Sequence, residues 1–424
     1  MFKLGTTSGG VNVTAVRDDA GEVRVVGRDF DGFRRAIDAQ AARWTGGSVA
    51  ARWLKLPDLE RLLLHDRAGQ RGELDLALVV TDWIPQLVEA GAVQPVDELL
   101  HGAPPEDWPA GWAPSMRALT RYRGLTYGLA YHDGPEMLTY RADLFDDTEE
   151  RRTFKQRFGY PLRPPVTWQE FVDQAVHFTR PEDGLWGTVQ AGLPDGHNNV
   201  YDFLLQLWSR GGAFLGPHDE PLFDSRQGLE ALQFLCRLWN QLGVVDPAAR
   251  GWDSVASGEH FAAGEAALMV NWSGFCAMSA ARDSPTHGRI RCGPVPRMST
   301  QTPSISLNVY WALVVAAGAR NPVRAWDFMR HAASSTMDKV TSLSGATGTR
   351  LSTWRDDEVR ASSPYYSVIE EVHDSVQSLP ATPSLPAAVE VLNVMVDDVI
   401  NGRTQPDVAL RRAADAVRTF PWAD

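Results

Sequence analysis

Predicted strands and helices alternate along the first part of this chain, and this alternation restricts the fold to few classes. Apolar runs with strand or helix periodicity follow one another in strict order. The predicted strands cover residues 22–30, 48–56 and 73–80, and the predicted helices cover 31–44, 57–68 and 83–91. Because a helix between two strands lets those strands run parallel, the pattern predicts a parallel α/β sheet.

The carboxyl ends of such strands are where an α/β sheet binds ligands. Thr81, Asp82 and Trp83 follow the third predicted strand, and residues 28–30 end the first. Asp82 has two interpretations of equal weight. It either caps the next helix, which stabilises a helix by about 1 kcal/mol, or faces a ligand.

Several later helices carry clear start signals. Thr167 and Glu170 form a capping box, Ser225 is a predicted cap, and Asn321 precedes a proline at the first helical position. Two further helices are predicted at the end of the chain, over residues 387–400 and 405–419.

Composition excludes some classes of partner. The chain has 424 residues, which favours two domains over one. Its 53 acidic and 41 basic residues give a net charge of −12, which repels nucleic acid and anionic lipid. Apolar runs of membrane-spanning length are absent from the sequence, so direct membrane insertion is not expected.

The sequence is compatible with two cellular compartments. The first thirty residues lack the apolar run of a leader peptide, so the chain as written is expected to be cytoplasmic, or extracytoplasmic if a leader was removed. Three cysteines without CxxC spacing suit a reducing compartment and suggest neither a disulfide framework nor a zinc site, although one internal pair stays open.

Common catalytic and cofactor motifs are missing. The ten histidines include no HxH or HxxxH pair, and no G-x-S-x-G, P-loop or G-x-G-x-x-G sequence occurs. The sequence therefore predicts no metal and no cofactor, and it favours a binding protein over an enzyme.

Aromatic and polar residues instead gather at predicted loop junctions. Sugars need this chemistry, because aromatic faces cover their C–H groups while amides and carboxylates bond their hydroxyls. Each residue taken singly is as easily explained by packing. The set is Tyr131, His132, Asp133, Asp195, His197, Asn198, Tyr201, Trp252, Asn271, Trp272, Asn308 and Tyr310.

The order of several motifs resembles one protein family. "GLTYGLAYHDGPEMLTYRADLF" at 124–145 resembles the segment in which family 1 extracellular solute-binding proteins, the maltose-binding-like receptors of ABC sugar importers, cross between lobes. Ala130 and Thr349 stand where the family has proline, and a leader is missing. Further similar segments follow in the family's order, at 164–179, 223–245, 261–275, 321–334 and 344–352.

The resemblance implies a fold and its division into lobes. The fold is α/β, of the two-lobe periplasmic-binding-protein type II, with mixed sheets flanked by helices and a ligand cleft between the lobes. The implied first lobe comprises residues 1–130 and 297–340, and the implied second lobe comprises 131–296 and the helical segment 341–424.

The resemblance also implies a function. It predicts a monomeric protein that binds a mono- or oligosaccharide or a sugar derivative by hinge closure and delivers it to the permease of an ABC transporter. The alternative is a leaderless relative that acts as a sensor, or as an enzyme with His132 and Asp133 as an acid/base pair. Carried over by motif, the cleft-facing residues are Asp82, Trp83, Tyr131 to Asp133, Asn271, Trp272 and Asn308 to Tyr310, with His197 and Asn198.

Overall fold

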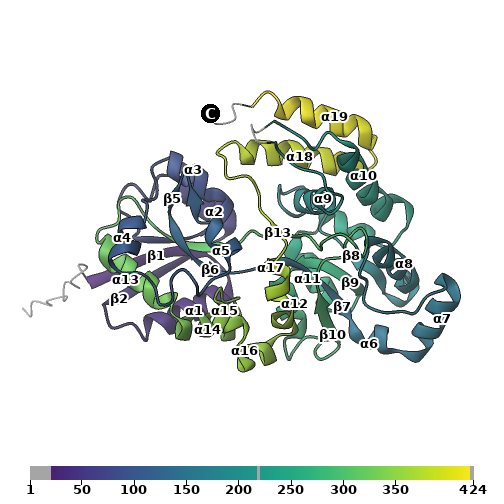
Figure 1. The fold of residues 1–424 in the computed structure, drawn as a ribbon, viewed down its shortest axis with the longest axis horizontal. Helices are drawn as coiled ribbons and strands as arrows, with labels where there is room; N and C mark the ends of the chain where they lie inside the picture. Colours follow the sequence, from purple (N-terminus) through teal and green to yellow (C-terminus); the bar gives the residue numbers. More distant parts are fainter. Residues whose placement is uncertain (1–20, 217–219, 421–424) are drawn as a thin grey trace, which may run out of the picture.

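Two mixed β-sheets, each flanked by helices, form two lobes that lie side by side in Figure 1. The structure is a computed structural model that describes residues 21–216 and 220–420. Residues 1–20 lie outside this range. The start of the predicted first lobe and most of the first thirty residues, which bear on the prediction about a leader peptide, therefore lie outside the described residues. The three free cysteines form no disulfide in the described residues.

The first lobe contains a five-stranded sheet of order β2-β1-β3-β12-β6. The parallel pairing of β1 with β2 and β3 confirms the prediction from residues 22–80. β12 enters from far along the chain and runs antiparallel to both of its neighbours, which makes the sheet mixed. The strands are β1 (Glu22–Arg28), β2 (Ser48–Leu54), β3 (Leu76–Val80), β6 (Gly128–His132) and β12 (Trp311–Val315).

Apolar side chains bury both faces of this sheet. The predicted two-sided burial of the third strand is confirmed, since Leu76, Leu78 and Val79 of β3 are all fully buried. In Figure 1 helix α13, drawn green, lies among the purple and blue elements that precede it in sequence. The helices of this lobe are α1 (Asp31–Ala41), α2 (Leu56–Glu60), η2 (Arg61–His65), η3 (Thr81–Trp83), α3 (Ile84–Glu89), α4 (Asp97–Gly102), α5 (Pro114–Ala118), α13 (Pro322–Ala332) and α14 (Ser335–Leu343), beside a ribbon of β4 (Arg121–Tyr122) and β5 (Leu125–Thr126).

The second lobe contains a four-stranded sheet of order β10-β7-β9-β8. β7 runs antiparallel to β9 and β10, and β8 runs parallel to β9. The strands are β7 (Glu136–Arg141), β8 (Trp186–Val189), β9 (Ala266–Trp272) and β10 (Ile290–Gly293). The helices are α6 (Ala142–Asp146), α7 (Thr148–Phe158), α8 (Trp168–Phe178), η4 (Pro181–Asp183), α9 (Asn198–Ser209), α10 (Arg226–Cys236), η5 (Arg237–Gln241), η6 (Pro247–Gly251), α11 (Ser254–Ala262), α12 (Ser273–Ala280), α18 (Leu385–Ile400) and α19 (Pro406–Val417).

The chain passes between the sheets more than once. It leaves the first sheet after β6 and enters the second at β7, through residues 133–135. It returns through 294–310, where β11 (Ser306–Leu307) pairs in parallel with β13 (Val376–Gln377). Two connecting segments are thus hydrogen-bonded to each other between the lobes.

A group of short helices joins the lobes at their base. These are α15 (Leu351–Trp354), α16 (Asp357–Ser362), η7 (Pro364–Ser367) and α17 (Ile369–His373). Trp354, Tyr365 and Tyr366 are buried in the same apolar cluster as the first sheet, while η7 also contacts α12 and β10 of the second lobe. The predicted segment 341–424 is therefore divided between two apolar clusters. Its short helices pack in the first cluster, with the first sheet, and α18 and α19 pack in the second cluster, with the second sheet. The lobe boundaries stay a prediction.

The helix starts predicted from the sequence are confirmed. Thr167 Oγ1 accepts a hydrogen bond from the Glu170 N–H at 3.2 Å, and Glu170 Oε2 accepts one from the Thr167 N–H at 3.0 Å. Ser225 and Asn321 cap α10 and α13. Local signals of this kind need no tertiary context, because donor and acceptor lie within one turn.

We expect Thr167→Ala to lower the free energy of unfolding by about 1 kcal/mol, because the Glu170 N–H loses its capping acceptor. Urea denaturation measures this. Thr148→Ala is the control, since exposed Thr148 follows the actual cap of α7, Asp147. Equal stability of the two variants would contradict the capping role.

Candidate functional site

His132 and Asp133 lie where the chain leaves the first lobe, and Thr347 fixes both. The Thr347 N–H donates to His132 Nδ1 at 2.7 Å, and the Asp133 N–H donates to the Thr347 carbonyl at 3.0 Å. Burial lowers the pKa of His132 to about 4, so the ring is neutral at pH 7. Since Nδ1 is the acceptor, Nε2 carries the proton and is a hydrogen-bond donor.

The Asp133 carboxylate is hydrogen-bonded to another residue of the protein. Its Oδ2 lies 2.8 Å from Nε2 of His373, and Nδ1 of His373 lies 3.0 Å from the Ser115 hydroxyl. The His373 ring stacks on Trp354 with centroids 4.7 Å apart. Asp133 therefore ties the crossing to α17 and α5. Its hydrogen-bonded histidine is His373, and not its neighbour His132.

Asp82 faces the second lobe from the carboxyl end of β3. Neither η3 nor α3 has a side-chain cap in the structure, so the capping interpretation of Asp82 is wrong. Its carboxyl group instead interacts with the Tyr201 hydroxyl and with His197, both from α9 or its cap. Burial raises the pKa of Asp82, and these two contacts act against that shift.

Trp272 is held at the carboxyl end of β9, opposite α9. Its Nε1–H donates to Asn198 Oδ1 at 3.1 Å, and its backbone N–H donates to Asn271 Oδ1 at 2.8 Å. Its ring meets that of Tyr201 edge to face, with centroids 5.7 Å apart. Tyr201 thus connects the Trp272 ring of the second lobe with Asp82 of the first.

Two carboxyl groups that sequence reasoning missed lie beside this cluster. Glu136 begins β7 directly opposite Trp272 in the strand register, and Asp202 lies on α9 one turn beyond Asn198. Burial raises the pKa of Glu136 well above its usual range, with repulsion from Asp202 adding to the shift, and burial raises the pKa of Asp202 to about 8. The i, i+4 spacing of Asn198 and Asp202 was the available signal.

A second pair of residues, Arg28 and Asp253, interacts between the two lobes. Arg28 ends β1 in the first lobe, and burial lowers the pKa of its guanidinium while attraction to Asp253 opposes the shift. Asp253 caps α11 in the second lobe. The carboxyl ends of β1 and β3 thus both approach helix starts of the other lobe, as expected for ligand sites in α/β sheets.

Other predicted site residues lie in the apolar core. Trp83, Tyr131 and Tyr310 belong to the first apolar cluster. The Tyr131 hydroxyl donates to Gln40 Oε1 at 3.0 Å, and the Tyr310 hydroxyl donates to the Met116 carbonyl. The structure does not bring these three side chains to the residues around Trp272.

The remaining predicted residues, Trp252, His197 and Asn308, differ in how exposed they are to solvent. Trp252 is half-buried between the two apolar clusters and packs on His260, with ring centroids 4.5 Å apart. His197 is exposed, and its ring lies 6.1 Å from that of Tyr201. Asn308 is 0 % exposed, and neither polar atom of its side chain has a partner within the described part of the chain.

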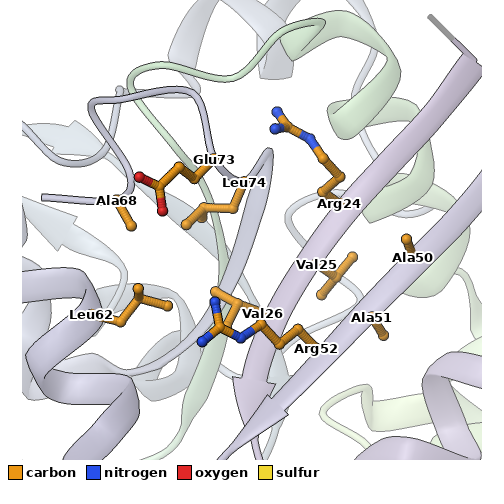
Figure 2. A pocket seen from close by; sticks show the side chains of 10 residues that line it. All are labelled: Arg24, Val25, Val26, Ala50, Ala51, Arg52, Leu62, Ala68, Glu73 and Leu74. Atoms are coloured by element: carbon orange, nitrogen blue, oxygen red, sulfur yellow. The ribbon is translucent and has the colours of Figure 1, made fainter. Parts of the chain in front are cut away.

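A separate cavity of about 220 Å³ lies in the first lobe (Figure 2). Its wall is mainly apolar, from Val26, Leu62 and Leu74 among others. Arg24 at its edge is already bonded to Asp75 at 2.8 Å. Because no predicted site residue lines this cavity, we place the candidate site at the lobe interface instead.

The described residues contain no group of three or more metal-binding side chains that could hold an ion. In the same part of the chain, no helix combines the length and apolar character needed to cross a membrane.

Comparison with known proteins identifies relatives along most of the chain. The family model for bacterial extracellular solute-binding proteins matches residues 49–339. A probable ABC transporter-binding protein of Deinococcus radiodurans is 23% identical over 365 residues, covering 84% of this chain and 82% of the relative. The mannitol-binding protein of Pseudomonas aeruginosa is 23% identical over 342 residues, covering 76% and 72%.

Solved structures of similar shape confirm the predicted two-lobe fold. Maltose-bound MalE3 of T. maritima has a TM-score of 0.80 at 18% identity, over 94% of this chain and 99% of that one. A solute-binding protein of Agrobacterium radiobacter in complex with ribitol has a TM-score of 0.81 at 21% identity, over 94% and 98%.

We expect Asp202→Asn to stabilise the protein increasingly as pH rises. The folded pKa of about 8 exceeds the ordinary value of 3.8, so the folded state keeps a proton that the unfolded chain releases, and stability falls as pH rises through this window. Asn does not ionise. The Tm difference between variant and wild type should therefore grow by roughly 2 °C or more from about pH 5 to about pH 9.

The control for this experiment is Asp283→Asn, which removes the same charge at an exposed position. Differential scanning calorimetry of all three proteins at each pH gives the comparison. A Tm difference for Asp202→Asn that stays constant with pH would contradict the shifted pKa.

Proposed function

Because this chain belongs to the family of bacterial extracellular solute-binding proteins, we propose that it binds a sugar or polyol between its lobes as the substrate-binding component of an ABC transporter. The observation that carries the proposal is the interaction of the Asp82 carboxyl group in the first lobe with the Tyr201 hydroxyl in the second, whose ring packs edge to face on Trp272. Relatives in complex with maltose, ribitol, D-mannitol and alpha-D-tagatose share the fold.

The chemistry of the interface suits a polyhydroxylated ligand. Trp272 offers partly exposed aromatic surface for C–H groups, the buried Tyr201 ring packs edge to face against it, and Asp82 offers a carboxylate to hydroxyl donors. The neutral His132 ring offers an N–H donor. Aromatic surface with a few convergent polar groups is the usual composition of a small-molecule site.

Binding would act on the angle between the lobes. A ligand that contacts both lobes favours the closed state over the open one, through hinges in the connecting segments 133–135 and 294–310. A preference of about 5.5 kcal/mol for the closed state moves a 1:99 population to 99:1. Contacts from residues on both sides, such as Asp82 and Trp272, supply that discrimination.

We further propose that the protein acts as a monomer outside the cytoplasmic membrane. The extracellular role of the family supports this location. The closed form would present both lobes together to the permease of an ABC transporter, which takes over the sugar.

We predict that Trp272→Ala weakens sugar or polyol binding at least about tenfold, which corresponds to about 1.4 kcal/mol, because the ligand loses its aromatic surface. A thermal-shift screen of sugars and polyols, followed by calorimetric titration of the best ligand, measures the effect. Trp186→Ala is the matched control, since Trp186 begins β8 opposite Ala266, at the other end of β9. Equal binding by both variants would place the site elsewhere.

We predict that the wild-type protein returns its ligand chemically unchanged and that His132→Ala weakens binding without any change in turnover. The reason is that the Nε2–H of His132 donates to the ligand, while Asp133 is engaged with His373. Mass spectrometry of the ligand after incubation and denaturation tests this. Conversion by the wild type that disappears in His132→Ala would support an enzyme instead.

A further inference from the structure

Asp82, Glu136 and Asp202 form a group of three carboxyl groups beside α9 at the lobe interface. Asp82 and Glu136 both act on the Tyr201 hydroxyl, and Asp202 repels Glu136. Within residues 21–216 and 220–420, no lysine or arginine forms an ion pair with any of the three, and the imidazole of His197 interacts with Asp82. Arg28, a cation of the same interface, is attracted to Asp253 instead.

The oxygen atoms of this group are poorly satisfied. Glu136 is only 2 % exposed, yet its Oε2 has no hydrogen-bond partner in the described structure, and the same holds for Asp82 Oδ1. Buried carboxylates without a counter-charge or donor are costly, by several kcal/mol as an order of magnitude. In the free protein Glu136 and Asp202 reduce this cost by holding protons, and a cationic ligand group takes the place of these protons, which pass to the solvent.

A small cavity lies beside Glu136 and Asp202. Its volume is about 10 Å³, close to the lower limit for one water molecule, and so for a group the size of an ammonium. Polar side chains make up much of its lining. They are Glu136, Gln190, Asn198, Asp202, Ser257 and Asn271.

The balance of donors and acceptors selects the ligand group. A hydroxyl brings acceptor lone pairs together with its donor, whereas a primary ammonium brings three donors, no acceptor and a positive charge. Hydrogen bonds from a charged donor to a carboxylate are roughly twice as strong as neutral ones. A site of unsatisfied carboxyl oxygens therefore discriminates in favour of the ammonium group.

We propose that Glu136 and Asp202 bind the primary ammonium group of an aminated sugar or polyol, whose hydroxyl groups occupy the remaining interface near Trp272 and Asp82. This inference rests on the function proposed above. It adds the chemical class of the ligand and assigns two positions, Glu136 and Asp202, as specificity-determining residues.

The test compares ligands that differ in one group. Sorbitol is paired with 1-amino-1-deoxysorbitol, and glucose with glucosamine, and each dissociation constant is measured by calorimetric titration near neutral pH. We expect the amine of at least one pair to bind at least about tenfold tighter than its neutral partner. In Glu136→Gln, which keeps the side-chain shape, the ratio between the two should fall to about one.

Glu98→Gln is the control, because it removes one negative charge from an exposed position on α4 of the first lobe. It should keep the preference for the amine, which separates a local site from general attraction by the net charge. Asp202→Asn provides a second variant of the pair and should also reduce the preference, which keeps the test valid where Glu136→Gln fails to fold.

The outcomes separate this inference from the proposed function. Neutral ligands that bind as tightly as their amines, or an amine preference that survives both Glu136→Gln and Asp202→Asn, would overturn the ammonium site and leave sugar binding standing. Absence of binding by either member of every pair in the thermal-shift screen and titrations would overturn both.

Discussion

The crossing at His132 and Asp133 is the constraint on which the rest of the structure depends. The chain has only residues 133–135 between β6 of the first sheet and β7, the first strand of the second sheet. Hydrogen bonds to Thr347 and the buried contact of Asp133 with His373 anchor the start of this connection. Because Glu136 follows at once as the first residue of β7, this crossing also sets the position of the binding interface between the sheets.

Under the proposed function, electrostatics decides which ligand groups the interface binds. Elsewhere the protein's buried carboxyl groups are matched by partners, as Asp75 is by Arg24 and Asp133 is by His373. Around Tyr201 they are not, and the acceptors of Asp82 and Glu136 remain unsatisfied within the described residues. Buried polar groups left without partners in a folded protein need an explanation, and the proposed ligand supplies one at this interface.

Local features of the fold were predictable from the sequence, whereas the division between core and site was not. The strands of residues 22–80 and the cap of Thr167 depend on neighbours in sequence, so periodicity and capping motifs predicted them. Tyr131 and Trp272 look alike as aromatic residues at loop junctions, yet one bonds Gln40 in the core and the other lies beside Asn198. Glu136 and Asp202 are distant in sequence, so only the folded chain shows that they form a pair.

Hydrogen–deuterium exchange with and without the most stabilising sugar or polyol tests the central claim most directly, because it reports each lobe separately. We predict that the ligand slows amide exchange in both facing segments together, around Asp82 in the first lobe and around Asn198 to Asp202 in the second. Helix α7, which packs against α6 and α8 in the second lobe, should be unchanged. Protection confined to one lobe would contradict binding between the lobes.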